Sequence, residues 1–428
     1  MMRRSATLLA VVASLSVPAA AQRDPAPAPP PPYPQEYRLR PFTLPDPGGD
    51  HGIGTIAYTV ASAASAPLRV IAWYPSDRMS GPTVPYLTPA EAQVQAPAVA
   101  RNFQWPRALL ADVAGIPTHA HRDAPVAAGR FPLVIFNHGL MSYPRQNTAL
   151  MEWLAARGYI VMSLAHPGDG ADLPTEHGTI ATLPAKPPTA SAIERLQAFW
   201  MGKDHQARTA ALPRFWEAVE ESGTVEKLGN WRRDTTALVD AVASGRVPVE
   251  ARAVARASDV RRMAFAGMSF GGSTAVSACQ IDRRCRAAIN LDGYEFDRRL
   301  YDTRLRMPLL LIQSDWTVFP NMGPARPDRT IYDYAYERWN RAGKTGTIHR
   351  YRLVGVRHLG LTDLALAPAD PVRDRMFGPA DGRTSNAQVA DLVTAFLGRY
   401  VAGTGDDVRA AAARHPGVVA HTADGLIE

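Results

Sequence analysis

Short apolar runs alternate with helical stretches along most of the chain after residue 131. A continuous apolar run of five or six residues, such as Pro132–Phe136, is typical of a parallel strand that helices cover on both faces. The pattern therefore predicts an α/β fold with a mostly parallel central sheet. We expect its strands near residues 131–136, 159–164, 261–266, 286–291, 308–313 and 348–354, and helices near residues 140–157, 231–243, 331–342 and 386–400.

The flanking and inserted segments have a different pattern. Residues 55–60 and 68–74 are rich in β-branched and aromatic side chains, which predicts two opening antiparallel strands. Residues 81–129 contain many prolines and read as an irregular excursion with one short helix, 89–99. Residues 166–230 interrupt the alternation with a loop and helices near 191–201 and 211–221. Because this insertion follows the carboxyl end of a strand, we interpret it as a cap, the alternative being a peripheral insertion without substrate contact. The predicted domain spans residues 37–400, and residues 401–428 form a tail to which we assign no role.

The first residues have the composition of a secretory signal peptide. Two arginines precede an apolar stretch, Ala6–Val17, that is too short to span a bilayer, and Ala19–Ala21 offers small residues for cleavage. We expect residues 1–21 to be removed and the protein to be exported to the periplasm or the medium. Residues 22–36 then form a proline-rich leader.

Composition, charge and motifs limit the classes of partner and cofactor that we expect. Apolar residues make up 46% and charged residues 20%, as in an ordinary globular protein. The net charge is +7, but the basic residues are scattered along the chain with acidic residues between them, so no basic stripe indicates a nucleic-acid surface. A weak contact with anionic membrane surfaces stays open. No phosphate-binding or dinucleotide motif occurs and we expect no cofactor and no obligate protein partner. Two cysteines, Cys279 and Cys285, are either a disulfide or two buried thiols.

The run Gly267-Met268-Ser269-Phe270-Gly271-Gly272 lies between an expected strand and a helix start. This context is that of a nucleophile elbow, in which a serine stands at the tip of a turn too tight for bulky neighbours. We therefore predict an α/β-hydrolase fold with Ser269 as nucleophile.

A serine nucleophile needs a histidine base and a carboxylate that orients it, and in this fold they follow the serine in the order acid, histidine. His358 lies in a loop four residues past the last expected strand, whereas His349 begins that strand and His415 and His421 lie in the tail. We therefore assign His358 as the base. The acid is Asp292 or Asp315, which follow neighbouring strands, and the residue pattern does not choose between them.

The tetrahedral intermediate requires two backbone N–H donors, one of which is the residue after the nucleophile, Phe270. The loop Asn137-His138-Gly139-Leu140 follows a strand and supplies the second. We interpret His138 as a structural histidine. The polar clusters His166–Asp169 with Asp172 and His177, and His119 with His121, are read as loops that satisfy their own polar groups rather than as metal sites.

These motifs together resemble the plasma and intracellular type II platelet-activating factor acetylhydrolases. The similarity rests on His138-Gly139-Leu140, the Ser269 elbow, Leu291-Asp292-Gly293 and the late His358, and covers about residues 68–362 apart from the insertion. It implies Asp292 as the acid, with Asp315 a different carboxylate, and Leu140 as the second oxyanion donor. Polyester and cutinase-like hydrolases, which share the elbow, use the position of Asp315.

The sequence thus predicts an exported carboxylic ester hydrolase that works through an acyl-enzyme without a cofactor. The alternatives are a cutinase-like or polyester hydrolase, a dienelactone-hydrolase-like esterase, which normally has cysteine at position 269, and a non-enzymatic binding protein on the same scaffold. Short-acyl phospholipids, simple esters and polyesters all stay open as substrates.

Overall fold

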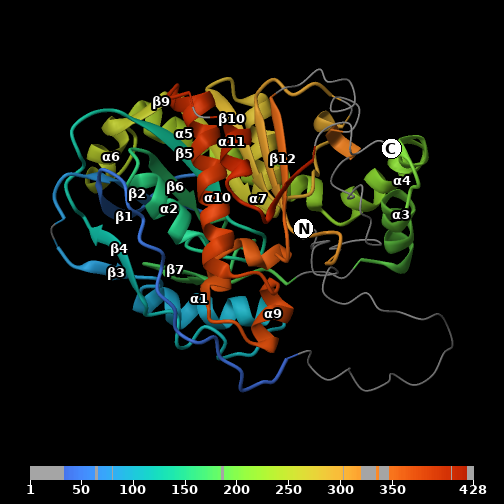
Figure 1. Cartoon of the computed structure of the whole chain (residues 1–428), viewed down its shortest axis with the longest axis horizontal. Helices are drawn as coiled ribbons and strands as arrows, with labels where there is room; N and C mark the ends of the chain where they lie inside the picture. Colours follow the sequence, from blue (N-terminus) through green and yellow to red (C-terminus); the bar gives the residue numbers. More distant parts are fainter. Residues whose placement is uncertain are drawn as a thin grey trace.

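A single large sheet organises the molecule (Figure 1). The computed structural model describes residues 33–62, 66–79, 81–184, 188–301, 303–319, 334–336, 347–405 and 407–421. Within them, an 11-stranded sheet has the order β13-β12-β11-β10-β9-β5-β6-β2-β1-β4-β3. The six strands from β6 to β12 in that order run parallel, and β2 joins β6 antiparallel. The mostly parallel sheet with helices on both sides is the predicted α/β-hydrolase fold.

The strands of the described residues are β1 (Gly52–Val60), β2 (Leu68–Ser76), β3 (Thr83–Pro85), β4 (Pro117–Arg122), β5 (Phe131–Asn137), β6 (Ile160–Leu164), β7 (Leu173–Thr175), β8 (Gly178–Ile180), β9 (Ser258–Met268), β10 (Cys285–Leu291), β11 (Leu309–Gln313), β12 (Ile348–Leu353) and β13 (Val418–Ala420). The α-helices are α1 (Pro89–Asn102), α2 (Thr148–Ala155), α3 (Ala190–Trp200), α4 (His205–Glu221), α5 (Thr224–Ser244), α6 (Arg252–Ala257), α7 (Phe270–Ile281), α9 (Pro371–Phe377), α10 (Gly382–Leu397) and α11 (Val408–Ala413). Short helical turns are η2 (Val249–Ala251), η3 (Arg298–Leu300), η5 (His358–Leu361), η6 (Asp363–Leu366) and the π-helical η7 (Gly398–Ala402).

Both faces of the central strands are buried, which explains their continuous apolar sequences. In β5, Leu133 and Ile135 join a core with α5 and α7, while Val134 and Phe136 join a second core with α2 and α10. Side chains alternate between the faces of a strand, so each apolar run supplies both cores at once. Figure 1 shows α10 lying across the near face of the sheet.

Two expectations for the ends of the sheet were wrong. The excursion at residues 81–129 contains β3 and β4, and β4 pairs in parallel with β1, so it extends the sheet rather than only crossing it. Residues 401–428 are not merely a tail, because α11 packs on α10 and β13 pairs antiparallel with β12. The edge strands β3 and β13 have three residues each and carry little periodicity of their own, so pairing with the neighbouring strand determines them.

The insertion at residues 166–230 contains the hairpin of β7 and β8, the helices α3 and α4, and the start of α5. Helices α3 and α4 pack against each other and lie together at one side in Figure 1. Their aromatic residues contact the segment that follows β10, as in the pair Trp216 and Tyr301, whose ring centroids are 5.0 Å apart. The expected signal peptide and most of the leader lie outside the described residues, as does the expected helix 331–342 except for Tyr334–Tyr336.

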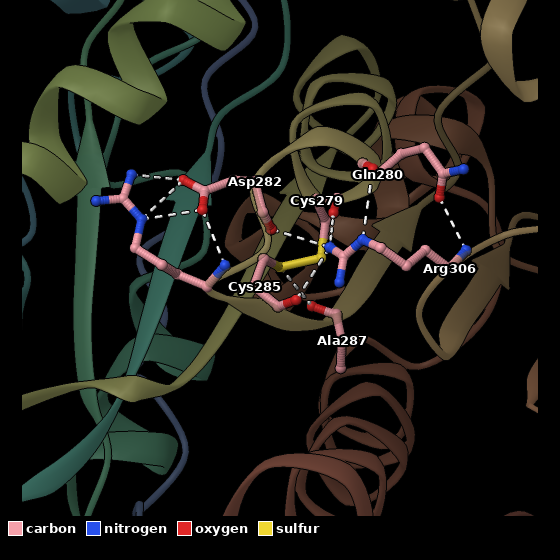
Figure 2. The surroundings of a disulfide bond; sticks show 7 residues. Cys279, Gln280, Asp282, Cys285, Ala287 and Arg306 are labelled. Atoms are coloured by element: carbon pink, nitrogen blue, oxygen red, sulfur yellow. Dashed lines mark hydrogen bonds and ion pairs between the residues drawn. A yellow bond between two sulfur atoms is a disulfide. The ribbon is translucent and has the colours of Figure 1, made fainter.

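Cys279 and Cys285 form a disulfide, so the first of the two alternatives for them is the one the structure adopts. The bridge joins the end of α7 to the start of β10. Arg306 lies beside it, and its guanidinium donates hydrogen bonds to the carbonyl oxygens of Cys279, Asp282 and Cys285 (Figure 2). These acceptors include carbonyls that the end of a helix leaves without an intrahelical donor. No helix among the described residues is long and apolar enough to cross a membrane.

Candidate active site

Ser269 occupies the tight turn between β9 and α7. Its backbone has φ 57° and ψ −125°, a conformation that is rare for residues other than glycine. The Ser269 N–H donates to the carbonyl of Leu291 at 2.8 Å, and its carbonyl accepts from the N–H of Gly272 at 2.9 Å. Such a turn persists only where the surrounding structure holds it, and strain of this kind concentrates at functional sites.

Backbone atoms crowd the two glycines on either side of Ser269, Gly267 and Gly271. A Cβ on Gly267 would overlap the carbonyl of Gly271, and a Cβ on Gly271 would overlap the carbonyls of Asn137 and His138. The elbow therefore packs directly on the backbone of the loop that follows β5. The predicted reason for glycine at these positions, lack of room at the turn, holds in the structure.

His358 meets the serine from the loop after β12. Its Nε2 lies 2.9 Å from Ser269 Oγ, although 89 residues separate the two in sequence. His358 begins the turn η5, and its side chain is 22% exposed, so the group that would exchange protons with a substrate is accessible. Ser269 itself is 6% exposed.

Asp292 completes this arrangement. Its Oδ2 lies 2.7 Å from His358 Nδ1, and its Oδ1 accepts a hydrogen bond from the N–H of Ser314 at 3.1 Å. An acceptor at Nδ1 places the imidazole proton there, which leaves Nε2 able to accept the proton of Ser269. The carboxylate is buried, so water does not compete for the histidine.

Asp315, the alternative acid, has a different set of partners. Its carboxylate pairs with Arg352 at 2.7 Å and accepts from the N–H of Gly355 at 2.8 Å, and its own N–H donates to the carbonyl of Val356 at 2.7 Å. Hydrogen bonds from Thr317 and Gly355 and the charge of Arg352 lower the pKa of Asp315 against the opposing effect of its burial. Asp315 therefore holds the loop that carries His358.

The two expected oxyanion donors lie on neighbouring segments. Phe270 begins α7, where the first backbone N–H groups have no intrahelical acceptor. Leu140 follows the β5 loop, in which the flanking N–H groups of Gly139 and Met141 are bonded to Gln146 Oε1 and to the carbonyl of Asp169. In the described part of the chain the N–H groups of Leu140 and Phe270 donate to no protein acceptor. Both are thus available to a ligand.

His138 is a buried, neutral histidine. Its Nδ1 donates to the carbonyl of Gly139 at 2.7 Å, and its Nε2 accepts from the N–H of His166 at 3.3 Å. Burial lowers the pKa of His138 to about 3. The side chain therefore shapes the loop that carries Leu140 without carrying a charge.

The polar clusters that were expected to be loops satisfying their own polar groups bond instead to partners on other parts of the chain. His119 and His121 lie on strand β4, so the loop expectation was wrong for that cluster. His166 lies 3.2 Å from Asp234 and 3.0 Å from Asn137 Oδ1, and Asp172 pairs with Arg101 at 2.7 Å. His119 bonds to Glu152, His121 bonds to the carbonyl of Gly81, and His177 is exposed.

Several residues that support the site carry no recognisable signal in the sequence. Gln146 bonds to the N–H of Gly139 in the loop after β5, and Glu295 bonds to Asn290, seven and five residues away in sequence. Ser314 bonds to Asp292 across 22 residues. Glycine and serine spacing identified the elbow, but no spacing rule identifies these contacts.

Comparison with known proteins places the chain in a family. The model of the family described as platelet-activating factor acetylhydrolase, isoform II, matches residues 41–182 and 250–326, which together are half of the chain. The chain belongs to this family. The matched ranges contain Leu140, Ser269, Phe270 and Asp292, whereas residues 183–249, with α3, α4 and α5, fall between them.

A platelet-activating factor acetylhydrolase from Canis lupus familiaris is 26% identical to the chain over 215 residues. This similarity covers 48% of the chain and 45% of the relative, so the chain matches less than half of that protein's length. A solved ferulic acid esterase from Streptomyces cinnamoneus aligns with a TM-score of 0.62 and 22% identity. The alignment covers 89% of this chain and 99% of the esterase. The second similarity shows the fold.

Proposed function

We propose that this member of the platelet-activating factor acetylhydrolase family is a serine hydrolase of carboxylic esters. The observation that carries the proposal is the continuous hydrogen-bonded series from Ser269 Oγ through His358 to Asp292 Oδ2, with separations of 2.9 and 2.7 Å. Ser269 attacks the ester carbonyl while His358 Nε2 takes its proton, and Asp292 stabilises the imidazolium that forms. The N–H groups of Leu140 and Phe270 bind the oxyanion.

Collapse of the tetrahedral intermediate breaks the ester bond. His358 returns the proton to the leaving alcohol, and the acyl group remains on Ser269 Oγ. Water, deprotonated by the same imidazole, then attacks the acyl-enzyme and releases the acid. No step in this sequence needs a cofactor.

The acid at position 292 favours this reading over a cutinase-like one. In the cutinase-like arrangement the carboxylate after β11 orients the histidine, but here that residue, Asp315, is bonded to Arg352 and Gly355. The serine at position 269 also differs from the cysteine expected of a dienelactone hydrolase. The name of the family suggests an ester with a short acyl group, and we propose this class as the substrate. The structural neighbour suggests a feruloyl ester, which is the competing class to test.

Covalent labelling tests the proposal directly. A fluorophosphonate probe should label the native protein and fail to label Ser269→Ala, because the probe reacts only with an activated serine. Ser273→Ala, one turn further along α7 with a buried hydroxyl, is the matched control and should label normally. An unlabelled native protein would contradict the proposal.

An ester panel then defines the substrate. Acyl lengths from acetyl upward, an oxidised phospholipid, a feruloyl ester and a polyester film should be compared by kcat/KM, since discrimination between esters appears in that ratio. A marked preference for long acyl chains or for the film would contradict the short-acyl assignment while leaving the esterase proposal intact.

We also propose that the mature chain is exported, with residues 1–21 acting as the signal peptide. The Cys279–Cys285 disulfide supports this, because disulfides persist in oxidising compartments and are rare in reducing ones.

A further inference from the structure

Trp231, on α5, contacts both segments that carry the oxyanion donors. Its ring packs edge-to-face on Phe270, with centroids 4.9 Å apart, and on His138, with centroids 5.3 Å apart. On its flat side it stacks on His166 at 3.6 Å with an interplanar angle of 8°. Trp231 is 1% exposed. A single rigid side chain thus lies against Phe270 and against the loop that ends in Leu140.

The same helix binds the turn that follows β6. The indole N–H of Trp231 donates to Asp169 Oδ2 at 2.9 Å, and the ammonium of Lys227 pairs with Asp169 Oδ1. Lys227 precedes Trp231 by one helical turn, so both donors project from one face of α5. Side chains of Lys227 and Asp169 are 10% and 13% exposed, and a pair shielded to this degree is screened less than one on the surface.

The turn that contains Asp169 is also hydrogen-bonded to the loop that carries Leu140. The carbonyl of Asp169 accepts from the N–H of Met141 at 2.7 Å, and the N–H of Ala171 donates to the carbonyl of Ser142 at 2.7 Å. Met141 has φ 65°, a backbone conformation that requires support in a residue with a side chain. The peptide directly after Leu140 is therefore placed by Asp169.

We propose that Asp169, Lys227 and Trp231 are positioning residues for the oxyanion hole. They form a brace through which α5 holds the N–H groups of Leu140 and Phe270 at a constant separation. This inference rests on the proposed function of the site. It goes beyond the family likeness, because Lys227 and Trp231 lie in residues 183–249, which the family model does not match.

The physical reason is the geometric tolerance of oxyanion stabilisation. Donors act by being aimed in advance at the charge that develops in the transition state, and deleting one donor costs roughly 10²–10³-fold in kcat. Loosening the brace leaves both donors in place but lets them move. We expect a smaller loss of about 10- to 100-fold, confined to interactions made in the transition state.

Trp231→Phe is the variant that tests the brace, because it keeps an aromatic ring and removes the hydrogen bond to Asp169. The matched control is Trp153→Phe on α2, which removes an indole hydrogen bond of the same 2.9 Å length, to Thr394, on the other face of the sheet. The measurements are kcat and KM for p-nitrophenyl acetate, the inhibition constant of an arylboronic acid, which forms a tetrahedral adduct with serine, and Tm.

We expect Trp231→Phe to lower kcat and to weaken boronate binding by a similar factor, with KM changed by about twofold or less. Trp153→Phe should change only Tm. Native kcat and native boronate affinity in Trp231→Phe would overturn the inference. Lys227→Met, which keeps the apolar stem, should shift both quantities in the same direction and covers the case in which Trp231→Phe does not fold.

Hydrogen exchange separates failure of this inference from failure of the proposed function. Amides of residues 139–142 should exchange faster in Trp231→Phe than in the native protein or in Trp153→Phe, because local opening becomes easier when the Asp169 turn is released. This readout does not need activity. An inactive, unlabelled native protein would overturn the esterase proposal, and unchanged exchange would overturn the brace.

Discussion

Asp292 and Asp315 are two buried aspartates at the ends of neighbouring strands, and they differ in what their carboxylates meet. Asp292 contacts His358 itself, whereas Asp315 contacts the backbone of Gly355 and the guanidinium of Arg352. The first arrangement orients an imidazole ring. The second holds the loop on which that ring is carried, so both aspartates serve His358 but by different routes.

We predict that Asp292→Asn lowers kcat by about 10³–10⁴-fold with little change in Tm, because an amide at this position favours the wrong tautomer of His358. Asp315→Asn should lower kcat far less and should lower Tm, since the amide oxygen still accepts from Gly355 but the ion pair with Arg352 is lost. Turnover and thermal unfolding of both variants check this. If only Asp315→Asn were crippled, Asp315 would be the acid.

Glu295 gives the protein a predicted pH dependence. Burial raises the pKa of its carboxyl to about 8 from 4.5, although hydrogen bonds from Tyr336 and Asn290 oppose the shift. Since the pKa is higher in the folded state, the contribution of Glu295 to the free energy of unfolding is complete below pH 4.5 and is lost as the pH rises through about 8.

The native protein should therefore lose on the order of 3 kcal/mol of stability between pH 6 and 9 through this group, and Glu295→Gln should not. Urea unfolding of both proteins across that range measures the difference. Parallel curves for the two proteins would show that Glu295 does not titrate in the way described.

At the scale of elements, α7 is held at both ends by different means. At its start the Ser269 turn is bonded to the end of β10, and at its end the disulfide and Arg306 join it to the beginning of β10 (Figure 2). Helix α7 and strand β10 are thus linked at both ends of the helix. The two ends of α7 differ in the chemistry proposed for them, because only the first adjoins the proposed nucleophile, Ser269, and carries a proposed oxyanion donor, Phe270.

Removing the disulfide should accordingly affect stability more than turnover. We predict that Cys279→Ala/Cys285→Ala lowers the free energy of unfolding by about 2 kcal/mol, the loop-closure entropy for so short a loop, while kcat changes by less than about twofold. Urea unfolding with and without a thiol reductant is the measurement. The reductant should destabilise the native protein by the same amount and leave the variant unchanged. A large loss of kcat would show instead that the far end of α7 positions Ser269.

At the scale of the whole molecule, the candidate site is gathered from four strand ends. Ser269 follows β9, Asp292 follows β10, His358 follows β12, and the oxyanion loop follows β5. Parallel strands with right-handed crossovers bring these ends to one edge of the sheet. Helices α3 and α4 pack on the segment after Asp292, and α5 joins them to the body of the fold.

Export also concerns the whole chain. We predict that the protein recovered from the periplasm or medium of a secreting bacterium begins at Gln22, because small residues at positions 19 and 21 meet the requirement for cleavage. Ala21→Leu should block cleavage and Ala21→Ser should not. N-terminal sequencing checks this, and a chain that stays in the cytosol with Met1 in place would contradict it.

Local sequence determined those features that local sterics decide. Glycines at 267 and 271 predict the elbow because the turn admits no side chain there, and continuous apolar runs predict strands buried on two faces. His358 was identified by its place after the last strand of the series, since strand order brings that loop to the serine.

Tertiary structure alone decided the rest, because it depends on where chains far apart in sequence come together. Residue pattern left Asp292 and Asp315 equivalent, and the paths of the loops after β10 and β11 decided that Asp292 meets His358, 66 residues away. The pairing of β13 with β12 and the contacts of Trp231 with Phe270 and Asp169 are likewise made across long separations. A short edge strand or a buried aromatic residue looks the same in sequence whatever it touches, so its partner is known only once the chain has folded.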